Sequence, residues 1–373
     1  MSTRLIENGY HYGMTVEAPA GDVKSAPRAP RRRARATLAI VLLGAAVPLV
    51  LVAGIGVGQV VLSPADVVDA LARGATGHPA GTDAARLADT VVWQLRAPRA
   101  LLGFCVGAIL ALSGAALQAV VRNDLADPYL LGITSGASLG AAAAIALGVG
   151  AVAGALPTSG AAFLGALLAL AIVLALVGPR RRLGSGRLVL AGLAVGYALS
   201  AVTNLVVVLS DNRDAIRAIT FWMLGSLGQA SWGDLPVVAL ALVASLGVLV
   251  VWGRRLDAIG LGDDVARSLG SDPDRLRRDV AIVTAVAIAA AVAVSGSIGF
   301  VGLVVPHLAR GLVGATHRLL VPTSALLGGI LLVAADTLAR TVLAPREIPL
   351  GILTALLGTP LLLLLIARRT RDA

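Results

Sequence analysis

Acidic residues that could do chemistry within an apolar segment are rare in this sequence, and Asp336 is the clear candidate. Arg340 follows it at helical i,i+4 spacing, so both side chains fall on one helix face. This spacing predicts an ion pair near one end of a helix. A proton relay is the alternative, because ionisable groups inside a membrane commonly serve ion-coupled transport.

Motifs for catalysis or cofactor binding are missing from the sequence. A phosphate-binding loop of the G-x-x-x-x-G-K-[ST] type needs a lysine, and the only lysine is Lys24 in the N-terminal tail. No Cys/His cluster has metal-ligand spacing, and the single cysteine, Cys105, lies in an apolar run as a packing residue would. We therefore expect a chain that is not an enzyme and holds no cofactor or metal of its own.

A polar loop at residues 253–279 alternates charged side chains with apolar ones. Its pattern predicts a pair of short amphipathic helices that dock into a groove on a cytoplasmic partner, with Leu261, Val265 and Leu269 on the docking face. A solvated loop is the plainer alternative. The residues assigned to this contact are Leu261, Gly262, Val265, Ala266, Arg267, Leu269 and Gly270.

Two apolar runs rich in Gly, Ala and Ser fill residues 103–148 and are joined by a short polar turn. Each run is about as long as the roughly 20 residues that cross a bilayer, so we expect an antiparallel membrane hairpin packed inside a bundle. Asn123 is expected to cap the first helix, Pro128 to start the second, and Gly132 and Gly136 to face another helix closely. The residues assigned to this structure are Gln118, Asn123, Pro128, Gly132 and Gly136.

The composition requires a membrane protein. Hydrophobic residues make up 57% of the 373 residues, and the mean hydropathy is +0.87, which a soluble domain could not bury. Residues 1–36 are predicted to be a disordered basic tail, and 37–370 an all-α transmembrane domain with a short surface helix after Ser63. We expect about ten crossings, at 37–62, 100–121, 129–150, 160–177, 188–209, 235–252, 280–294, 300–313, 320–343 and 350–366.

The net charge of +10 reflects arginines in the loops rather than a nucleic-acid partner. Ten crossings place both termini on the same side as the 253–279 loop. Most of the 31 Lys and Arg residues then fall on that side, as the positive-inside rule requires of the cytoplasmic face. An interfacial or re-entrant helix is expected at 210–232 on the opposite side, where aromatic residues gather.

Several ordered blocks resemble the FecCD-type permeases of ABC importers. These are ten-helix membrane subunits that import ferric siderophores, haem and vitamin B12. The resemblance covers about residues 37–370, and it departs from the family pattern at Asp124, where proline is usual, and at Asp127. The matching blocks are the hairpin residues from Gln118 to Gly136, 261–270, 296–307 (GSIGFVGLVVPH), 335–340 and 347–352.

The resemblance implies the permease subunit of a binding-protein-dependent importer in the cytoplasmic membrane of a bacterium, with the bundle of a vitamin B12 importer permease. Its partners would be a second permease copy or a paralogue, two cytoplasmic ATPase subunits that bind ATP and Mg, and an extracytoplasmic binding protein. The translocation path would lie at the permease dimer interface, lined mainly by 188–209 and the polar stretch after it, with 129–150 and 300–313.

Three arginines on the side opposite the 253–279 loop run against the positive-inside trend: Arg96, Arg99 and Arg340. The resemblance implies that they dock acidic residues of the binding protein, and such rim charges would steer its approach. The alternative is a set of interfacial arginines that snorkel to lipid headgroups, with Arg340 neutralised by Asp336.

Ferric siderophore is the expected substrate, with haem or a corrinoid as the alternatives. A different class, the ion-coupled secondary transporter, places midplane charges on broken helices. Gly299 and Pro306 supply such a break, but no acidic residue stands beside it in the sequence. A membrane-embedded enzyme is the third class, and no catalytic constellation supports it.

Overall fold

The computed structural model describes residues 29–58, 60–78, 80–148, 158–178 and 184–372, so most of the expected N-terminal tail lies outside the described residues. These parts are helices and connecting turns, without a strand. The first half contains α1 (Ala29–Gly56), α2 (Pro64–Thr76), α3 (Asp83–Asp89), the π-helix η1 (Thr90–Arg96), α4 (Ala97–Val121), the 3-10 helix η2 (Pro128–Leu131), α5 (Ile133–Ala146), α6 (Thr158–Val177) and α7 (Ser185–Val208). The second half contains α8 (Arg213–Leu224), α9 (Leu235–Val251), α10 (Gly253–Gly260), α11 (Asp263–Ser268), α12 (Pro273–Ser295), α13 (Val301–Val313), α14 (His317–Ala339) and α15 (Leu350–Asp372).

Each predicted crossing contains at least one helix of the structure. Six described helices are long and apolar enough to span a bilayer, and the bent pair α9–α10, with an angle of 59°, provides a seventh span. Three shorter apolar helices, α5, α13 and α15, occupy the remaining predicted crossings. The all-α membrane fold is confirmed, although α1 begins at Ala29, before the expected boundary at 37.

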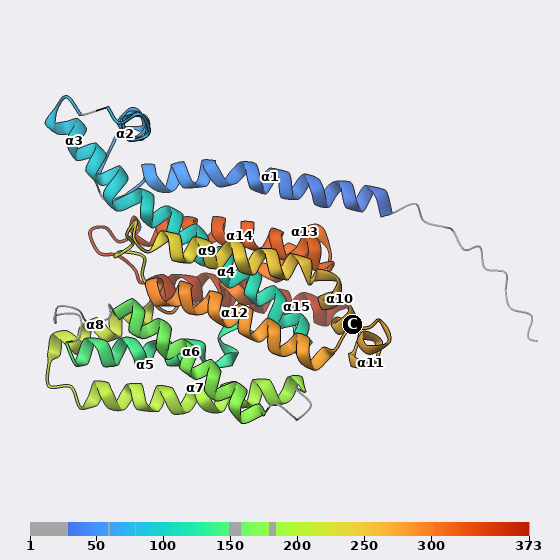
Figure 1. Ribbon diagram of the computed structural model, residues 1–373. Coiled ribbons are helices and arrows are strands. Elements are labelled where there is room, and N and C mark those ends of the chain that lie inside the picture. Colours follow the sequence, from blue (N-terminus) through green and yellow to red (C-terminus); the bar gives the residue numbers. More distant parts are fainter. Residues whose placement is uncertain (1–28, 59, 79, 149–157, 179–183, 373) are drawn as a thin grey trace, which may run out of the picture.

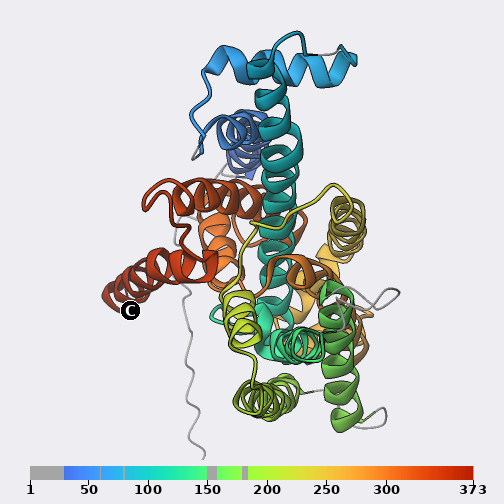
Figure 2. The same ribbon diagram turned by 90° about the vertical axis from the view of Figure 1, so that its left-hand side faces the viewer.

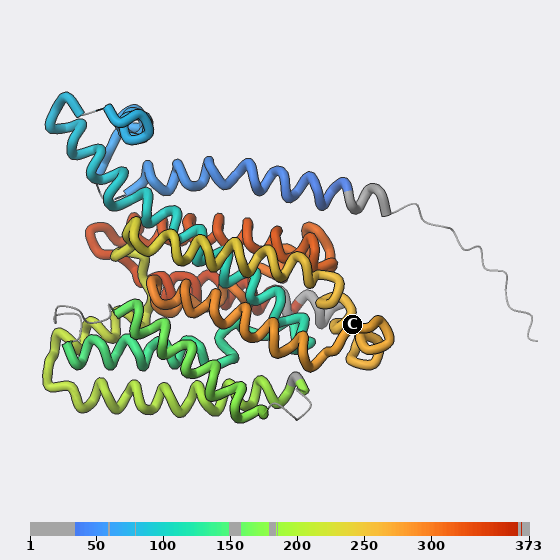
Figure 3. The backbone as a smooth tube through the Cα atoms, viewed as in Figure 1, coloured from blue at the N-terminus to red at the C-terminus, as the bar shows by residue number. Residues whose placement is uncertain are grey.

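The bundle has two distinct ends (Figure 1). The loop end carries α10 and α11, together with the start of α1 and the end of α15. The far end carries α2, α3, α8 and the connection between α14 and α15, and the tube in Figure 3 follows the chain between the two ends. The described chain ends therefore lie on the same side as the 253–279 loop, as the sequence predicts.

Helix α4 passes through the middle of the molecule (Figure 2) and is buried along almost its whole length. It packs against α14, α12, α13 and α9. Glycines permit the closest approaches: a Cβ added at Gly107 would lie 2.2 Å from the carbonyl oxygen of Gly328 on α14. The outer helices α1 and α7 are mostly exposed, as expected for surfaces that meet lipid or another subunit.

The two small-residue runs form α4 and α5 and pack inside the bundle as predicted, but the two helices do not pack mainly on each other. Helix α5 packs against α6 and α7, while the small-residue faces of α4 are filled by α13 and α14. Gly136 does face another helix closely, as predicted, because a Cβ there would lie 2.3 Å from the carbonyl oxygen of Gly165 on α6. Gly132, at φ +72°, turns the chain between η2 and α5, and the predicted crossing at 129–150 contains these two separate helices.

The turn between α4 and η2 is closed differently from the expectation. Helix α4 ends at Arg122, in the left-handed region at φ 56°, and the Asn123 backbone N–H donates to the Gln118 carbonyl (3.1 Å). The Asn123 side chain accepts from the Leu125 N–H (2.9 Å), so it orders the turn and does not cap the helix. Pro128 begins η2 rather than α5.

Candidate functional site

Helices α10 and α11 present an apolar cluster at the loop end. Leu261 is 72% exposed and Leu269 65%, and Val265 is exposed between them. Large apolar side chains outside the membrane-spanning helices mark a contact surface for another protein. The prediction of two short helices with these residues outward is confirmed, and docking on a partner stays a prediction.

The other residues assigned to this loop shape the two helices. Gly262, at φ 121°, connects α10 to α11, and Gly270, at φ 78°, lies in the turn that follows α11. Ala266 is buried against the bundle, which fixes the opposite face of α11. Arg267 pairs with Asp264 at 2.9 Å on the surface, where an ion pair contributes little stability.

Arg277 on α12 joins α11 to the core, and the sequence analysis did not single it out. Its side chain is almost fully buried. Its Nε donates to the Val120 carbonyl at the end of α4 (3.1 Å), and its Nη2 donates to Asp263 at the start of α11 (2.6 Å). A buried, bidentate arginine pair of this kind fixes geometry as well as charge. The apolar cluster is therefore held rigidly against α4 and α12.

The electrostatics of this junction favour an ionised carboxylate. The hydrogen bond from Arg277 holds the pKa of Asp263 below its usual range, with smaller contributions from Arg122 and Arg267. The guanidinium of Arg122 lies 3.9 Å from Asp263, so the last residue of the α4 turn also faces α11. Only Arg267 among these groups was assigned to the loop from the sequence.

Gln118 ties the turn after α4 to α13. Its Nε2 donates to the carbonyls of Ala126 (3.4 Å) and Gly302 (3.3 Å), and its Oε1 accepts from Arg310 Nη2 (2.7 Å). Arg310 also lies 3.5 Å from Asp124, the residue that departs from the family pattern. The assignment of Gln118 to the structure of this turn fits these contacts, since the side chain is buried and bonded on both its amide atoms.

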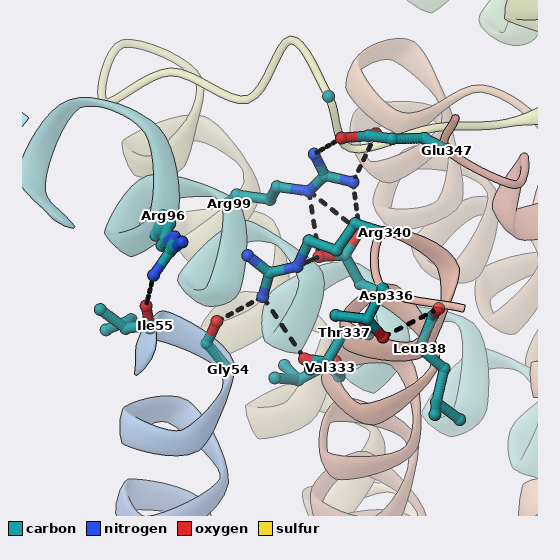
Figure 4. Close-up of polar contacts among 12 residues, drawn as sticks. Gly54, Ile55, Arg96, Arg99, Val333, Asp336, Thr337, Leu338, Arg340 and Glu347 are labelled. Atoms are coloured by element: carbon teal, nitrogen blue, oxygen red, sulfur yellow. Dashed lines mark hydrogen bonds and ion pairs between the residues drawn. The ribbon is translucent and has the colours of Figure 1, made fainter. Parts of the chain in front are cut away.

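At the far end, Arg96 and Arg340 are buried, each 4% exposed, although the sequence analysis placed them among rim charges. Arg96 donates to the carbonyls of Ile55 (3.1 Å) and Gly56 (2.9 Å), and Arg340 donates to the Gly54 carbonyl (Figure 4). These are the last carbonyls of α1, which have no partner within the helix. Two arginines from η1 and from the end of α14 therefore cap α1, a role that sequence spacing could not reveal.

Arg99 on α4 is held by two carboxylates. Its Nε and Nη2 donate to Asp336 on α14 (3.0 and 2.9 Å), and its Nη1 and Nη2 donate to Glu347 (3.1 and 3.0 Å) (Figure 4). Arg340 Nε lies 3.4 Å from Asp336, so the predicted i,i+4 pair is present. Two arginines beside one buried acid favour the ion pair over a proton relay.

The three arginines nevertheless meet at one place. A cavity of about 220 Å³ at the far end is lined by Arg96, Arg99, Arg340 and Glu347, with Gly228 of the α8–α9 connection. The sequence predicted that the three arginines share one end of the bundle. It did not predict that Glu347 joins them, because Glu347 was noted only as part of the family-like block 347–352. In the described part of the chain, no three of His, Cys, Asp and Glu gather as metal ligands would.

Residues 42–368, which include both ends of the bundle, match the FecCD transport family. The chain belongs to this family. The FecCD match runs from within α1 into α15, so all ten predicted crossings fall within it or overlap it.

Relatives of this FecCD chain are named for different substrates. The cobalamin import system permease protein BtuC of Halobacterium salinarum is 44% identical, over 76% of this chain and 74% of its own length. The hemin transport system permease protein HmuU of Yersinia pestis is 42% identical, over 74% and 84%. The Fe(3+)-citrate import system permease protein YfmE of Bacillus subtilis is 37% identical, over 91% and 98%.

A solved structure shares the fold. It is described as an inward-facing conformation of a metal-chelate type ABC transporter, and it superimposes with a TM-score of 0.76 at 31% identity. The match covers 88% of this chain and 98% of that one. The chain is thus an integral membrane protein with the architecture of an ABC transporter permease.

Proposed function

We propose that this chain is the permease subunit of a binding-protein-dependent ABC importer. Family membership and the metal-chelate transporter fold support this assignment. The chain itself contains no ATPase motif, so a separate cytoplasmic subunit hydrolyses ATP and binds the Mg. The permease contributes the pathway and the contact through which hydrolysis drives transport.

The exposed cluster of Leu261, Val265 and Leu269 is the observation that carries this proposal. A channel or an ion-coupled transporter has no need of apolar side chains projecting from the bundle on rigid short helices. An ATP-driven permease needs such a surface, because the motion of the ATPase must be transmitted through a firm contact. Arg277 supplies the rigidity, and the cluster fits a groove on the ATPase.

The loop end faces the cytoplasm in this proposal, and the far end faces the outside of the cytoplasmic membrane. The arginine excess in the tail and loops supports this orientation. The start of α1 and the end of α15 then lie on the cytoplasmic side. On the opposite side, an extracytoplasmic binding protein meets the cavity lined by Arg96, Arg99 and Arg340.

A second permease, either a copy of this chain or a paralogue, completes the pathway. The largely exposed helix α7 supports this, since it lies at the edge of the bundle and packs only on its inner face. We place the path at the dimer interface, lined mainly by α7 and α8 with α5 and α13. A broad, weakly polar path lets a bulky complex leave as readily as it enters.

The substrate class is a metal chelate, and ferric siderophore is the substrate that we propose. The names of the relatives include Fe(3+)-citrate, hemin and cobalamin, all complexes of a metal ion with an organic ligand. Haem and a corrinoid are therefore the alternatives within the same class.

Uptake by proteoliposomes tests the assignment. The permease is reconstituted with an ATPase subunit and a binding protein from the same organism, and iron-55-labelled siderophore, haem and cobalamin are offered in parallel. We expect uptake of the siderophore that needs ATP, the ATPase and the binding protein. If only haem or only cobalamin is taken up, that compound is the substrate in place of the siderophore. Uptake by the permease driven only by an ion gradient would refute the proposal that the chain belongs to an ABC importer.

A further inference from the structure

Arg99 uses all its hydrogen-bonding edges within the chain. The Asp336 carboxylate takes Nε and Nη2, and the Glu347 carboxylate takes Nη1 and Nη2. A guanidinium offers five donors in a fixed fork, so a third carboxylate cannot bind in the bidentate manner while both remain. An acidic partner that binds Arg99 in the bidentate manner must therefore displace one of the two.

The two carboxylates differ in how firmly they are held. Asp336 is 2% exposed and also faces Arg340, so releasing it would leave a buried charge. The Glu347 side chain is 38% exposed and borders the cavity at the far end. Glu347 can therefore turn into water more readily than Asp336, because its own side chain already reaches solvent. It is the carboxylate that can leave.

Glu347 belongs to the connection between α14 and α15, which also holds the end of α8. The Ile348 N–H donates to the Ala339 carbonyl (3.0 Å), and the Leu350 N–H donates to the Gly225 carbonyl directly after α8 (2.9 Å). A change at Glu347 therefore takes place within one turn of the element that we assign to the outer part of the path.

We propose that Glu347 occupies the place of an acidic side chain of the extracytoplasmic binding protein, and that docking exchanges one carboxylate for the other on Arg99. This inference rests on the proposed function. The exchange replaces one bidentate pair by another, so it fixes orientation while adding little net affinity. Glu347 keeps Arg99 neutralised when the permease is alone. Docking is therefore weaker and more reversible than it would be on an arginine without a carboxylate partner.

The test measures how tightly the binding protein that supports uptake binds the full transporter in nanodiscs. E347Q removes the competing charge, and we expect the Kd to fall roughly two- to five-fold, because one partly exposed carboxylate no longer competes for Arg99. The matched control is D211N, which removes an exposed acid at the same end of the bundle, between α7 and α8. The gain of E347Q must exceed that of D211N, because both change the net charge equally.

Two further variants keep the result decisive. E347D preserves the charge but shortens the reach of the carboxylate to Arg99, and we expect it also to lower the Kd for the binding protein. If E347Q does not fold, the Kd of E347D still tests the exchange. In R99Q, the added E347Q substitution should give no gain, because the contested arginine is absent. Binding by E347Q and E347D equal to or weaker than the control would overturn the exchange.

Failure of the exchange and failure of the proposed function give different results. If the wild-type transporter binds the binding protein and imports with ATP, but Glu347 variants bind no more tightly than D211N, the importer stands and the exchange is wrong. If the wild type neither binds a binding protein nor requires the ATPase, the proposed function itself is wrong.

Discussion

A guanidinium can be buried only where acceptors are arranged around it, and the far end shows how this chain meets that need. Arg96 and Arg340 take their acceptors from the last carbonyls of α1, which would otherwise be unsatisfied in an apolar setting. Arg99 takes carboxylates instead. Three arginines with the same expected role therefore have two different local functions.

The capping role of Arg96 predicts a loss of stability. R96A leaves the Ile55 and Gly56 carbonyls without their donor, and we expect destabilisation of about 2 kcal/mol, seen as a lower thermal unfolding midpoint in detergent. R86A, at an exposed arginine on α3, is the matched control. An unfolding midpoint for R96A equal to that of R86A would show that the cap is dispensable.

The Asp263–Arg277 pair predicts a pH dependence. Arg277 lowers the pKa of Asp263 in the folded state, so the pair stabilises the protein above the unfolded value of about 3.9 and is lost as pH falls through the folded pKa. Thermal unfolding of wild type and D263N should therefore differ at pH 6 to 7 and converge in stronger acid. A difference that persists unchanged in acid would contradict this assignment.

At the scale of elements, short helices and close helix contacts do most of the positioning. Helices α10 and α11 are too short to be stable alone, and they hold their shape because Ala266 is buried and Asp263 is bonded to α12. Helices α5 and α6 meet through glycine, so their separation has no tolerance for a larger side chain.

The apolar cluster predicts a coupling defect. In the double variant L261D/L269D two charges would enter an apolar groove on the ATPase without partners, so transport should fall at least ten-fold while the permease still folds. ATP hydrolysis and uptake are measured on the same proteoliposomes. R275D, which adds an acid at an exposed position on α12, should keep transport coupled. Unchanged uptake in the double variant would refute the docking face.

The α5–α6 contact predicts a folding defect. G136L places a side chain where a Cβ alone would lie 2.3 Å from the Gly165 carbonyl oxygen, so we expect little folded protein by size-exclusion chromatography. G44L on α1 is the control, since no described atom lies within 4 Å of a Cβ added there. Normal yield and transport by G136L would mean that the two helices separate readily.

The elements were more predictable than their partners. Lipid demands long apolar helices, so hydropathy located a helix in each predicted crossing, and the helix start at Ser63, which forms a capping box with Asp66 in the structure, marked the beginning of α2. Small residues lie on several faces of α4, and nothing local indicates that Gly107 meets Gly328 rather than α5. The roles of Arg277 and Glu347 depend on contacts between distant segments, which spacing along the sequence does not encode.

At the scale of the whole molecule, the two ends of the bundle present surfaces of different chemistry. The loop end offers an apolar surface backed by arginine, and the far end offers arginines partly neutralised by carboxylates. Charges on such a rim act over distance and affect the rate of encounter more than the strength of binding.

This arrangement predicts a kinetic effect of Arg99. R99Q should slow association with the binding protein several-fold and make the rate less sensitive to salt, because part of the steering field is lost. Association rates at low and high ionic strength measure this, with R86Q on α3 as the control for a simple loss of charge. Equal rates for R99Q and wild type at both salt concentrations would exclude Arg99 from the docking surface.

One continuous helical stretch, Asp83–Val121, contains both Arg99 and Val120. Its 39 residues extend about 58 Å at 1.5 Å per residue, nearly twice the hydrocarbon thickness of a bilayer. About midway along it carries Arg99, which is bonded to Asp336 and Glu347, and at its loop end the Val120 carbonyl is held by Arg277. It crosses the bundle as one helix, so an axial shift at its far end is transmitted to the loop end without passing through any loop. The π-helix η1 lies just before Arg99 in the chain, and it is the place where the backbone hydrogen bonds of this long helix can shift by one residue.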